Sequence, residues 1–357
     1  MRTLNNTTLI PRSRTILAAL AALCCGQAAG ERTVSLAYTT EWQTDFHKNT
    51  NWVNLLAAEA SIGLSRKLSA DVATISVATT RPESIIPDLL TFSNIEEENI
   101  PLALSRLGLT FTGTDWSISA GVGNVNDAFF VTPLTSLFTN SSCGIFPTIS
   151  CNFPIANYPD AALGIEGCYR HADITLNSAL YNGNGHHHFI GSDCVFRIRP
   201  ATEGIFNINA LNYNRNDNNY NLGIGLYHGR DADNETGTQN TSPTPTTPKE
   251  KTDIFYWLYA EQKITERLSL MAQISQCPLI TSGCRNFYGA GAAYRAHKYE
   301  IGIYSCYADF TGDYEWASEL TVKYGLSSHI DLQSSIHYIK NTLSQGPVGL
   351  FRVNVTF

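Results

Sequence analysis

The residues best suited to chemistry are carboxylates and amides gathered in two short segments. NIEEEN sets three glutamates between two asparagines, and GNVNDAFF joins an amide and a carboxylate to two phenylalanines. The candidate side chains are Asn94, Glu96, Glu97, Glu98, Asn126, Asp127, Phe129 and Phe130. Their oxygens can accept hydrogen bonds from hydroxyl groups, and a phenyl ring can stack on the apolar face of a sugar ring. For the glutamates, a solvated acidic turn is the simpler alternative.

Other reactive groups lack the arrangement that catalysis, nucleotide binding or metal binding requires. The nucleophile pattern G-x-S-x-G is absent, and GAGAA has no phosphate-loop lysine after it. The consecutive residues His186, His187 and His188 would point in different directions, which predicts an exposed loop rather than a metal site. We therefore expect no enzymatic activity, no cofactor and no metal.

The cysteines suggest disulfides without fixing them. Cys143 and Cys151 share one loop, and Cys277 and Cys284 flank one turn. Each pair is close enough to bridge, although spacing alone does not determine connectivity. Three further cysteines leave an odd count, and buried free thiols on strands are an equal alternative for them.

Residues 1–30 have the order of a secretory signal peptide. Three arginines precede the apolar run TILAALAALCC, and small residues follow it up to Gly30. The run is too short to span a bilayer, and lipidation of Cys24 or Cys25 is less favoured because small neighbours are missing. We expect export, with residues 31–357 forming the mature domain.

The charge of the chain disfavours nucleic acid as a partner. The whole chain has a formal net charge of −7, and loss of the arginine-containing leader would make the mature domain more acidic. Binding to phosphates requires the opposite sign. We therefore expect no nucleic-acid partner.

A period of two residues runs through the rest of the chain. In FRVNVTF at the C-terminus, and in segments such as ELTVKY, apolar side chains alternate with polar ones. About sixteen such runs follow one another, each near the ~10 residues of a tilted membrane strand, with Gly- and Asn-rich turns between them. The pattern predicts an all-β fold, either a soluble sandwich or a transmembrane antiparallel barrel.

Two observations favour the barrel. Charged residues recur on the polar faces of many runs, as expected for a lumen: Arg106, Glu166, Arg197, Arg199, Glu319, Lys323, Asp331 and His337. Aromatic residues gather near the ends of runs, where they would form girdles at the membrane interfaces: Trp257, Tyr259, Phe287, Tyr288, Tyr304 and Tyr324.

The C-terminal strand supplies a third observation. It alternates up to its last residue, Phe357, although chain ends usually fray. A terminal phenylalanine matches the assembly signal of outer-membrane barrels, whose last strand pairs with the first. We therefore predict a transmembrane antiparallel β-barrel of about sixteen strands, closed by the C-terminal strand.

One central region resembles the carbohydrate-selective porin family of the OprB type. The matching elements are FSNIE at 92–96, GNVNDAFF at 123–130, LFTNSSCGI at 137–145 and YPDAALGIEGCY at 158–169, together with the terminal VGLFRVNVTF. The chain departs from the family in its shorter length and in carrying Val122 and Gly123 where Gly-Arg is expected before NVND.

The resemblance implies passive diffusion of sugars through the outer membrane of a Gram-negative cell. The implied partners are outer-membrane lipid, lipopolysaccharide, the barrel assembly machinery and small sugars, and a homo-trimer stays open as an alternative to a single barrel. The rival hypothesis is a secreted soluble β-sandwich, either a lectin or a glycan-active enzyme.

The acidic segment also suggests a mild preference for cations. Fixed carboxylates at Glu96, Glu97, Glu98 and Asp127 would attract cations into a narrow pore. Arginines in the lumen would oppose that preference or reverse it. We expect the ion current to fall when a permeating sugar is added.

Overall fold

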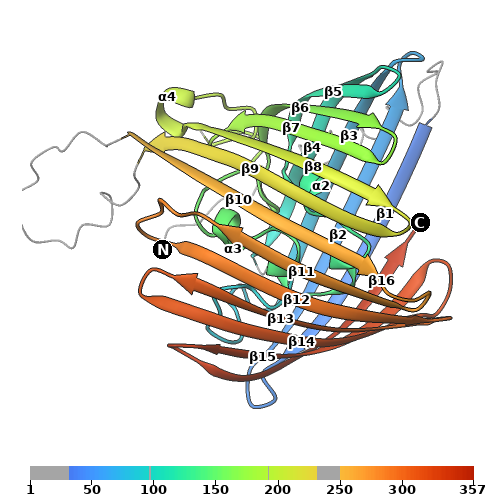
Figure 1. Cartoon of the computed structure of the whole chain (residues 1–357), viewed down its shortest axis with the longest axis vertical. Coiled ribbons are helices and arrows are strands. Elements are labelled where there is room, and N and C mark those ends of the chain that lie inside the picture. Colours follow the sequence, from blue (N-terminus) through green and yellow to red (C-terminus); the bar gives the residue numbers. More distant parts are fainter. Residues whose placement is uncertain (1–31, 96–97, 192, 231–249) are drawn as a thin grey trace, which may run out of the picture.

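The structure is a computed structural model that describes residues 32–95, 98–191, 193–230 and 250–357. Its sixteen described strands form one closed antiparallel barrel (Figure 1). The strands are β1 (Arg32–Thr44), β2 (Thr50–Gly63), β3 (Leu68–Thr79), β4 (Ile100–Thr112), β5 (Trp116–Gly123), β6 (Ala162–His171), β7 (Ile174–Asn182), β8 (Ile205–Arg215), β9 (Asn218–Arg230), β10 (Glu250–Lys263), β11 (Leu268–Gln276), β12 (Cys284–Ala296), β13 (Tyr299–Phe310), β14 (Asp313–Gly325), β15 (Ile330–Asn341) and β16 (Gln345–Thr356). The predicted fold class is confirmed, while the predicted signal peptide lies outside the described residues.

The last strand closes the barrel, as predicted. β16 pairs with β15 on one side and with β1 on the other, from Ala37 opposite Thr356 to Thr44 opposite Gly349. Beyond the strand, the Phe357 amide donates to the Leu36 carbonyl at 2.9 Å and its carbonyl accepts from the Leu36 amide at 3.1 Å. The chain end is ordered because its backbone is paired and no sheet edge remains there.

The alternation places apolar side chains on the outside of the barrel. On β14, Trp316 and Leu320 are exposed, whereas Glu319 between them is buried. Every strand pairs with two neighbours, so this alternation passes from strand to strand and covers the outer wall with large exposed apolar residues. Water does not favour such a surface, whereas bilayer hydrocarbon does. Among the described residues, no helix is both long enough and apolar enough to cross a bilayer.

The aromatic residues correct one expectation. Trp257, Tyr259, Phe287 and Tyr304 were expected in interfacial girdles, but their side chains point inward and are buried. Tyr288 lies on the outer face, as expected. The inward rings contact a loop inside the barrel instead of the membrane interface.

Two long loops enter the barrel from one rim, whereas the opposite rim carries only short turns. We name residues 80–99 loop L2 and residues 124–161 loop L3. L3 contains α2 (Asn126–Phe129), two 3-10 turns and α3 (Pro147–Ser150), and Figure 1 shows α2 and α3 inside the ring of strands. A third segment on this rim, which joins β7 to β8, contains α4 (Pro200–Glu203).

An apolar core holds L3 against one side of the barrel. The ring of Phe130 lies 5.5 Å from that of Trp257, and Phe138 lies 5.3 Å from Tyr304, centroid to centroid. This core includes inward residues of β7, β8 and β10–β14. It packs L3 against these strands, and accessible polar side chains lie in the cavities that remain around L3.

Candidate functional site

A buried carboxylate on β14 fixes the middle of L3. Glu319 accepts hydrogen bonds from the backbone amides of Thr139 at 2.9 Å and Asn140 at 3.0 Å, and from the Thr139 hydroxyl at 2.9 Å. His337 on β15 lies 3.0 Å from the same hydroxyl through Nε2. Glu319 and His337 face inward, as predicted, but the loop covers both of them.

A second carboxylate on the same strand fixes L2. Glu315 accepts from the backbone amides of Leu89 at 2.6 Å and Leu90 at 3.2 Å. Asn341 on β15 donates to Glu315 at 2.8 Å and to the Pro87 carbonyl at 2.9 Å. Sequence reasoning missed Glu315, although its position on the inner face of β14 follows from the alternation around Glu319.

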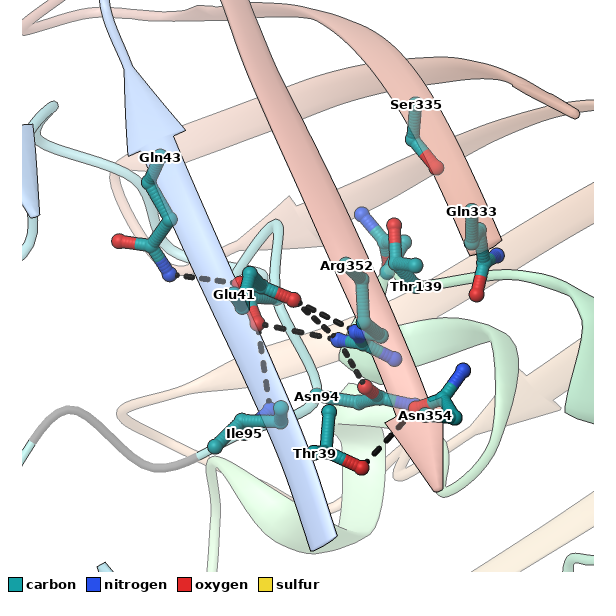
Figure 2. Close-up of polar contacts among 12 residues, drawn as sticks. Thr39, Glu41, Gln43, Asn94, Ile95, Thr139, Gln333, Ser335, Arg352 and Asn354 are labelled. Carbon is teal, nitrogen blue, oxygen red and sulfur yellow. Dashed lines mark hydrogen bonds and ion pairs between the residues drawn. The ribbon is translucent and has the colours of Figure 1, made fainter. Parts of the chain in front are cut away.

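The tip of L2 is bound at the seam where the barrel closes (Figure 2). Arg352 on β16 lies opposite Glu41 on β1, and its guanidinium contacts the Glu41 carboxylate at 2.5 and 2.7 Å. A guanidinium nitrogen also donates to the Asn94 side-chain oxygen at 2.8 Å, and Gln43 donates to Glu41 at 2.8 Å. Glu41 is 0% exposed and Arg352 is 7% exposed. Asn94 therefore holds the loop in place, while Glu96 and Glu97 beside it lie outside the described residues.

Three of the predicted charges meet at α2. Arg106 on β4 contacts Glu166 on β6 at 3.0 Å and Asp127 of L3 at 3.5 Å. The Tyr181 hydroxyl donates to Glu166 at 2.7 Å, which fixes the carboxylate that orients Arg106. Unlike the anchoring groups, Arg106 and Asp127 stay accessible, with 24% and 49% of their side chains exposed. The structure thus brings together three residues that sequence reasoning placed in the lumen, around an accessible pair of opposite charges.

Comparison with solved structures identifies the architecture. The high-pH structure of OprB from Pseudomonas putida matches with a TM-score of 0.74 over 97% of this chain and 96% of that one, at 14% identity. OmpT, an outer membrane protein of Vibrio cholerae in a trimer form, gives a TM-score of 0.59 over 92% of this chain and 100% of that one, at 10% identity. A mutant of the Rh. blastica porin matches with a TM-score of 0.58 over 92% of this chain and 100% of that one, also at 10% identity. The chain has the porin fold.

The likeness lies in the architecture rather than in the sequence. No protein-family model and no curated protein matches the chain. The structural match to OprB nevertheless confirms the resemblance to that type of barrel over nearly the whole length. What the interior of this barrel could bind has to be inferred from the residues that face it.

The cavities inside this porin fold follow one another along L3. Arg106 and Asp127 line two neighbouring cavities, one of which also contains Glu59 and Asp71. The second shares Ala128, Phe129 and Asn177 with a third cavity beneath L3, and that cavity reaches the short-turn rim. The Arg106–Asp127 pair thus lies on the path that these cavities form toward the short-turn rim.

Among the other predicted residues of L2 and L3, some hold the loops, and Phe129 and Phe130 also line a cavity. The Asn126 side-chain oxygen accepts from the Tyr158 amide at 3.2 Å. Phe129 and Phe130 are each 6% exposed, and Phe130 packs between Phe146 and Trp257. Glu98 lies on an exposed stretch of L2.

Two arginines that were predicted to face the lumen lie elsewhere. Arg197 and Arg199 lie in the segment between β7 and β8, not on a lumen-facing strand. Arg197 pairs with Glu203, and Arg199 precedes α4. Lys323 and Asp331 do face inward, and they form an ion pair at 3.2 Å near the short-turn rim.

The structure shows free thiols where two bridges were suggested. Cys143 is buried, Cys151 is exposed, and Cys277 and Cys284 are buried, each without a disulfide. Both cysteines lie in L3, Cys143 in a buried 3-10 turn and Cys151 directly after α3, so the two thiols lie in different surroundings. Across the described residues, no group of His, Cys, Asp and Glu side chains is arranged to hold a metal ion.

Ion selectivity should depend on pH through Asp127. Desolvation inside the barrel raises the pKa of Asp127 to about 6, against the lowering effect of Arg106, and Glu166 and Glu59 raise it further. Below this pH the carboxyl group is neutral, and above it the group attracts cations. We therefore expect a stronger cation preference at pH 8 than at pH 5, measured as the reversal potential across a salt gradient. Asp127→Asn should abolish the change near pH 6; a variant that keeps it would contradict the assignment.

Proposed function

We propose that this chain is an outer-membrane porin that lets small neutral solutes, sugars in particular, diffuse through its lumen. The accessible Arg106–Asp127 pair carries the proposal. Its guanidinium donates hydrogen bonds and its carboxylate accepts them, so together the two groups suit a hydroxyl-rich solute without adding charge of one sign. Such contacts are few and individually weak, as permeation requires.

The apolar outer surface of the barrel supports the proposal that the chain lies in a membrane. Its exposed apolar residues match the lipid-facing band of a barrel, which a soluble lectin or glycan-active enzyme would not expose. By the usual asymmetry of such barrels, L2 and L3 enter from the cell exterior and the short turns face the periplasm. Export by a signal peptide, contact with lipopolysaccharide, insertion by the barrel assembly machinery and assembly as a single barrel or a trimer belong to the same proposal.

Two measurements test the function. The folded barrel should migrate faster than the boiled protein in SDS gels, and liposomes that contain it should swell in isotonic sugar at rates that fall with sugar size. A protein that fractionates with the periplasm or the medium would favour the soluble alternative. A membrane barrel that gives swelling with salts but with no sugar would limit the proposal to ions.

Deletion of Phe357 should impair assembly but not permeation. The residue closes two backbone hydrogen bonds with Leu36, and its ring is 72% exposed on the outside, far from L2 and L3. We expect less folded protein in the outer membrane, measured by heat-modifiable migration, and an unchanged conductance for each channel that does insert. Normal insertion after the deletion would contradict a role as assembly signal.

A further inference from the structure

Beneath L3, five asparagines line the inner wall where the path leads toward the short-turn rim. They are Asn177 on β7, Asn212 and Asn214 on β8, and Asn219 and Asn221 on β9. β8 and β9 pair so that Asn212 lies opposite Asn221 and Asn214 opposite Asn219. In the sequence, these residues flank the tight turn of LNYNRNDNNYN, and every second position points inward. We name these five residues the asparagine pocket.

The pocket is large enough for a small ligand and contains groups that could bind one. Its cavity volume is about 190 Å³, below the range typical of drug-sized ligands, which limits an occupant to a small molecule. Phe129, Phe130 and Trp257 form its apolar side. Some amides are already engaged: Asn221 donates to Asn212 and accepts from Trp257, and Asn177 donates to the Ala128 carbonyl at 2.9 Å. These bonds hold the side chains in fixed orientations.

Asn219, in contrast to these amides, has a buried side-chain oxygen that lacks a hydrogen-bond partner among the described residues. A buried acceptor without a partner is costly, so a donor from a solute or a water would stabilise it. It lies opposite Asn214, and both residues also line the next cavity toward the rim.

The charge of the pocket selects the class of ligand. Its described lining contains one charged side chain, Arg170, and no carboxylate. Each amide offers one acceptor and two donors without net charge, which matches the alternating donor and acceptor capacity of hydroxyl groups. We propose that the asparagine pocket is a second binding site for neutral polyhydroxylated solutes of monosaccharide size, next to the cavities that the Arg106–Asp127 pair lines. The inference rests on the proposed function and extends it to a site separate from that pair.

The test uses the full-length barrel in planar bilayers, with D-glucose as the probe. The double variant Asn214→Leu/Asn219→Leu keeps the side-chain size but removes two sets of donors and acceptors. We expect the glucose concentration that halves the ion current to rise about tenfold, the effect of losing one or two hydrogen bonds. Asn209→Leu is the matched control, because Asn209 lies on the outer face of the same strand and should leave the block unchanged.

Each remaining outcome has a defined meaning. If the leucine variant does not show heat-modifiable migration, Asn214→Ser/Asn219→Ser replaces it, with a smaller increase expected in the half-blocking concentration. An unchanged half-blocking concentration in a folded variant would overturn the pocket while leaving the porin proposal intact. A wild-type channel that gluconate blocks at lower concentration than glucose would show that Arg170 selects anions and would overturn the neutral class. Failure of wild-type liposomes to swell in glucose would instead overturn the proposed function.

Discussion

Replacing Arg352 by methionine should be among the most destabilising single changes in the barrel. The change leaves the fully buried Glu41 carboxylate without its ion-pair partner and releases Asn94 of L2. Removing one partner of a buried ion pair typically costs about 3–5 kcal/mol. The measurement is the urea concentration at which half of the detergent-extracted barrel loses its heat-modifiable migration.

A double variant separates the charge from the packing. Glu41→Gln/Arg352→Met removes both charges, so it should regain much of the stability lost in the single variant. Arg215→Met is the matched control: its ion pair with Asp173 is exposed, and pairs of that kind contribute about 0–1 kcal/mol. A double variant no more stable than the single one would show that the cost does not come from an unpaired Glu41.

Replacing Glu319 by leucine should widen the passage. Two backbone amides and one hydroxyl of L3 would lose their acceptor in a buried place, at a cost of about 1–3 kcal/mol for each unsatisfied group. The segment around Thr139 should leave the wall and shift α2 with Asp127. We expect a severalfold rise in single-channel conductance and entry of oligosaccharides that the unchanged barrel excludes.

Glu315→Leu is the corresponding change for L2, because Glu315 lies four residues earlier on the same strand and accepts from Leu89 and Leu90. L3 carries Asp127, whereas these L2 residues do not line the described cavities. The Glu315 variant should therefore alter sugar exclusion less than the Glu319 variant. Equal swelling rates of both variants and the unchanged protein across a series of sugar sizes would contradict the anchoring role of Glu319.

The strands could be predicted because their signal is local. Each strand carries its own alternation, and the count of about sixteen needs no knowledge of which strands pair. The inward position of Arg106, Glu166 and Glu319 follows from the same alternation of side chains between the two faces of a strand. Their partners could not be predicted, since Glu319 meets Thr139 at a separation of 180 residues.

The errors arose where alternation is ambiguous. In IFYWLY, which begins at Ile254, both faces are apolar, so the pattern does not show that Trp257 points inward. Around Arg197 the segment FRIR alternates like a strand, yet it lies in a loop where Phe196 and Ile198 are exposed. A local period describes a strand only if a neighbouring strand is available to pair with it.

The anchors of L2 impose an order on the biogenesis of the barrel. Asn94 binds Arg352 across 258 positions and Leu89 binds Glu315 across 226, so these two contacts of the loop form only when the last strands are in place. Until then the sheet is open, and its two edge strands lack partners. Because Arg352 both joins Glu41 across the seam and binds Asn94, the closure of the barrel and the fixing of this part of L2 occur together.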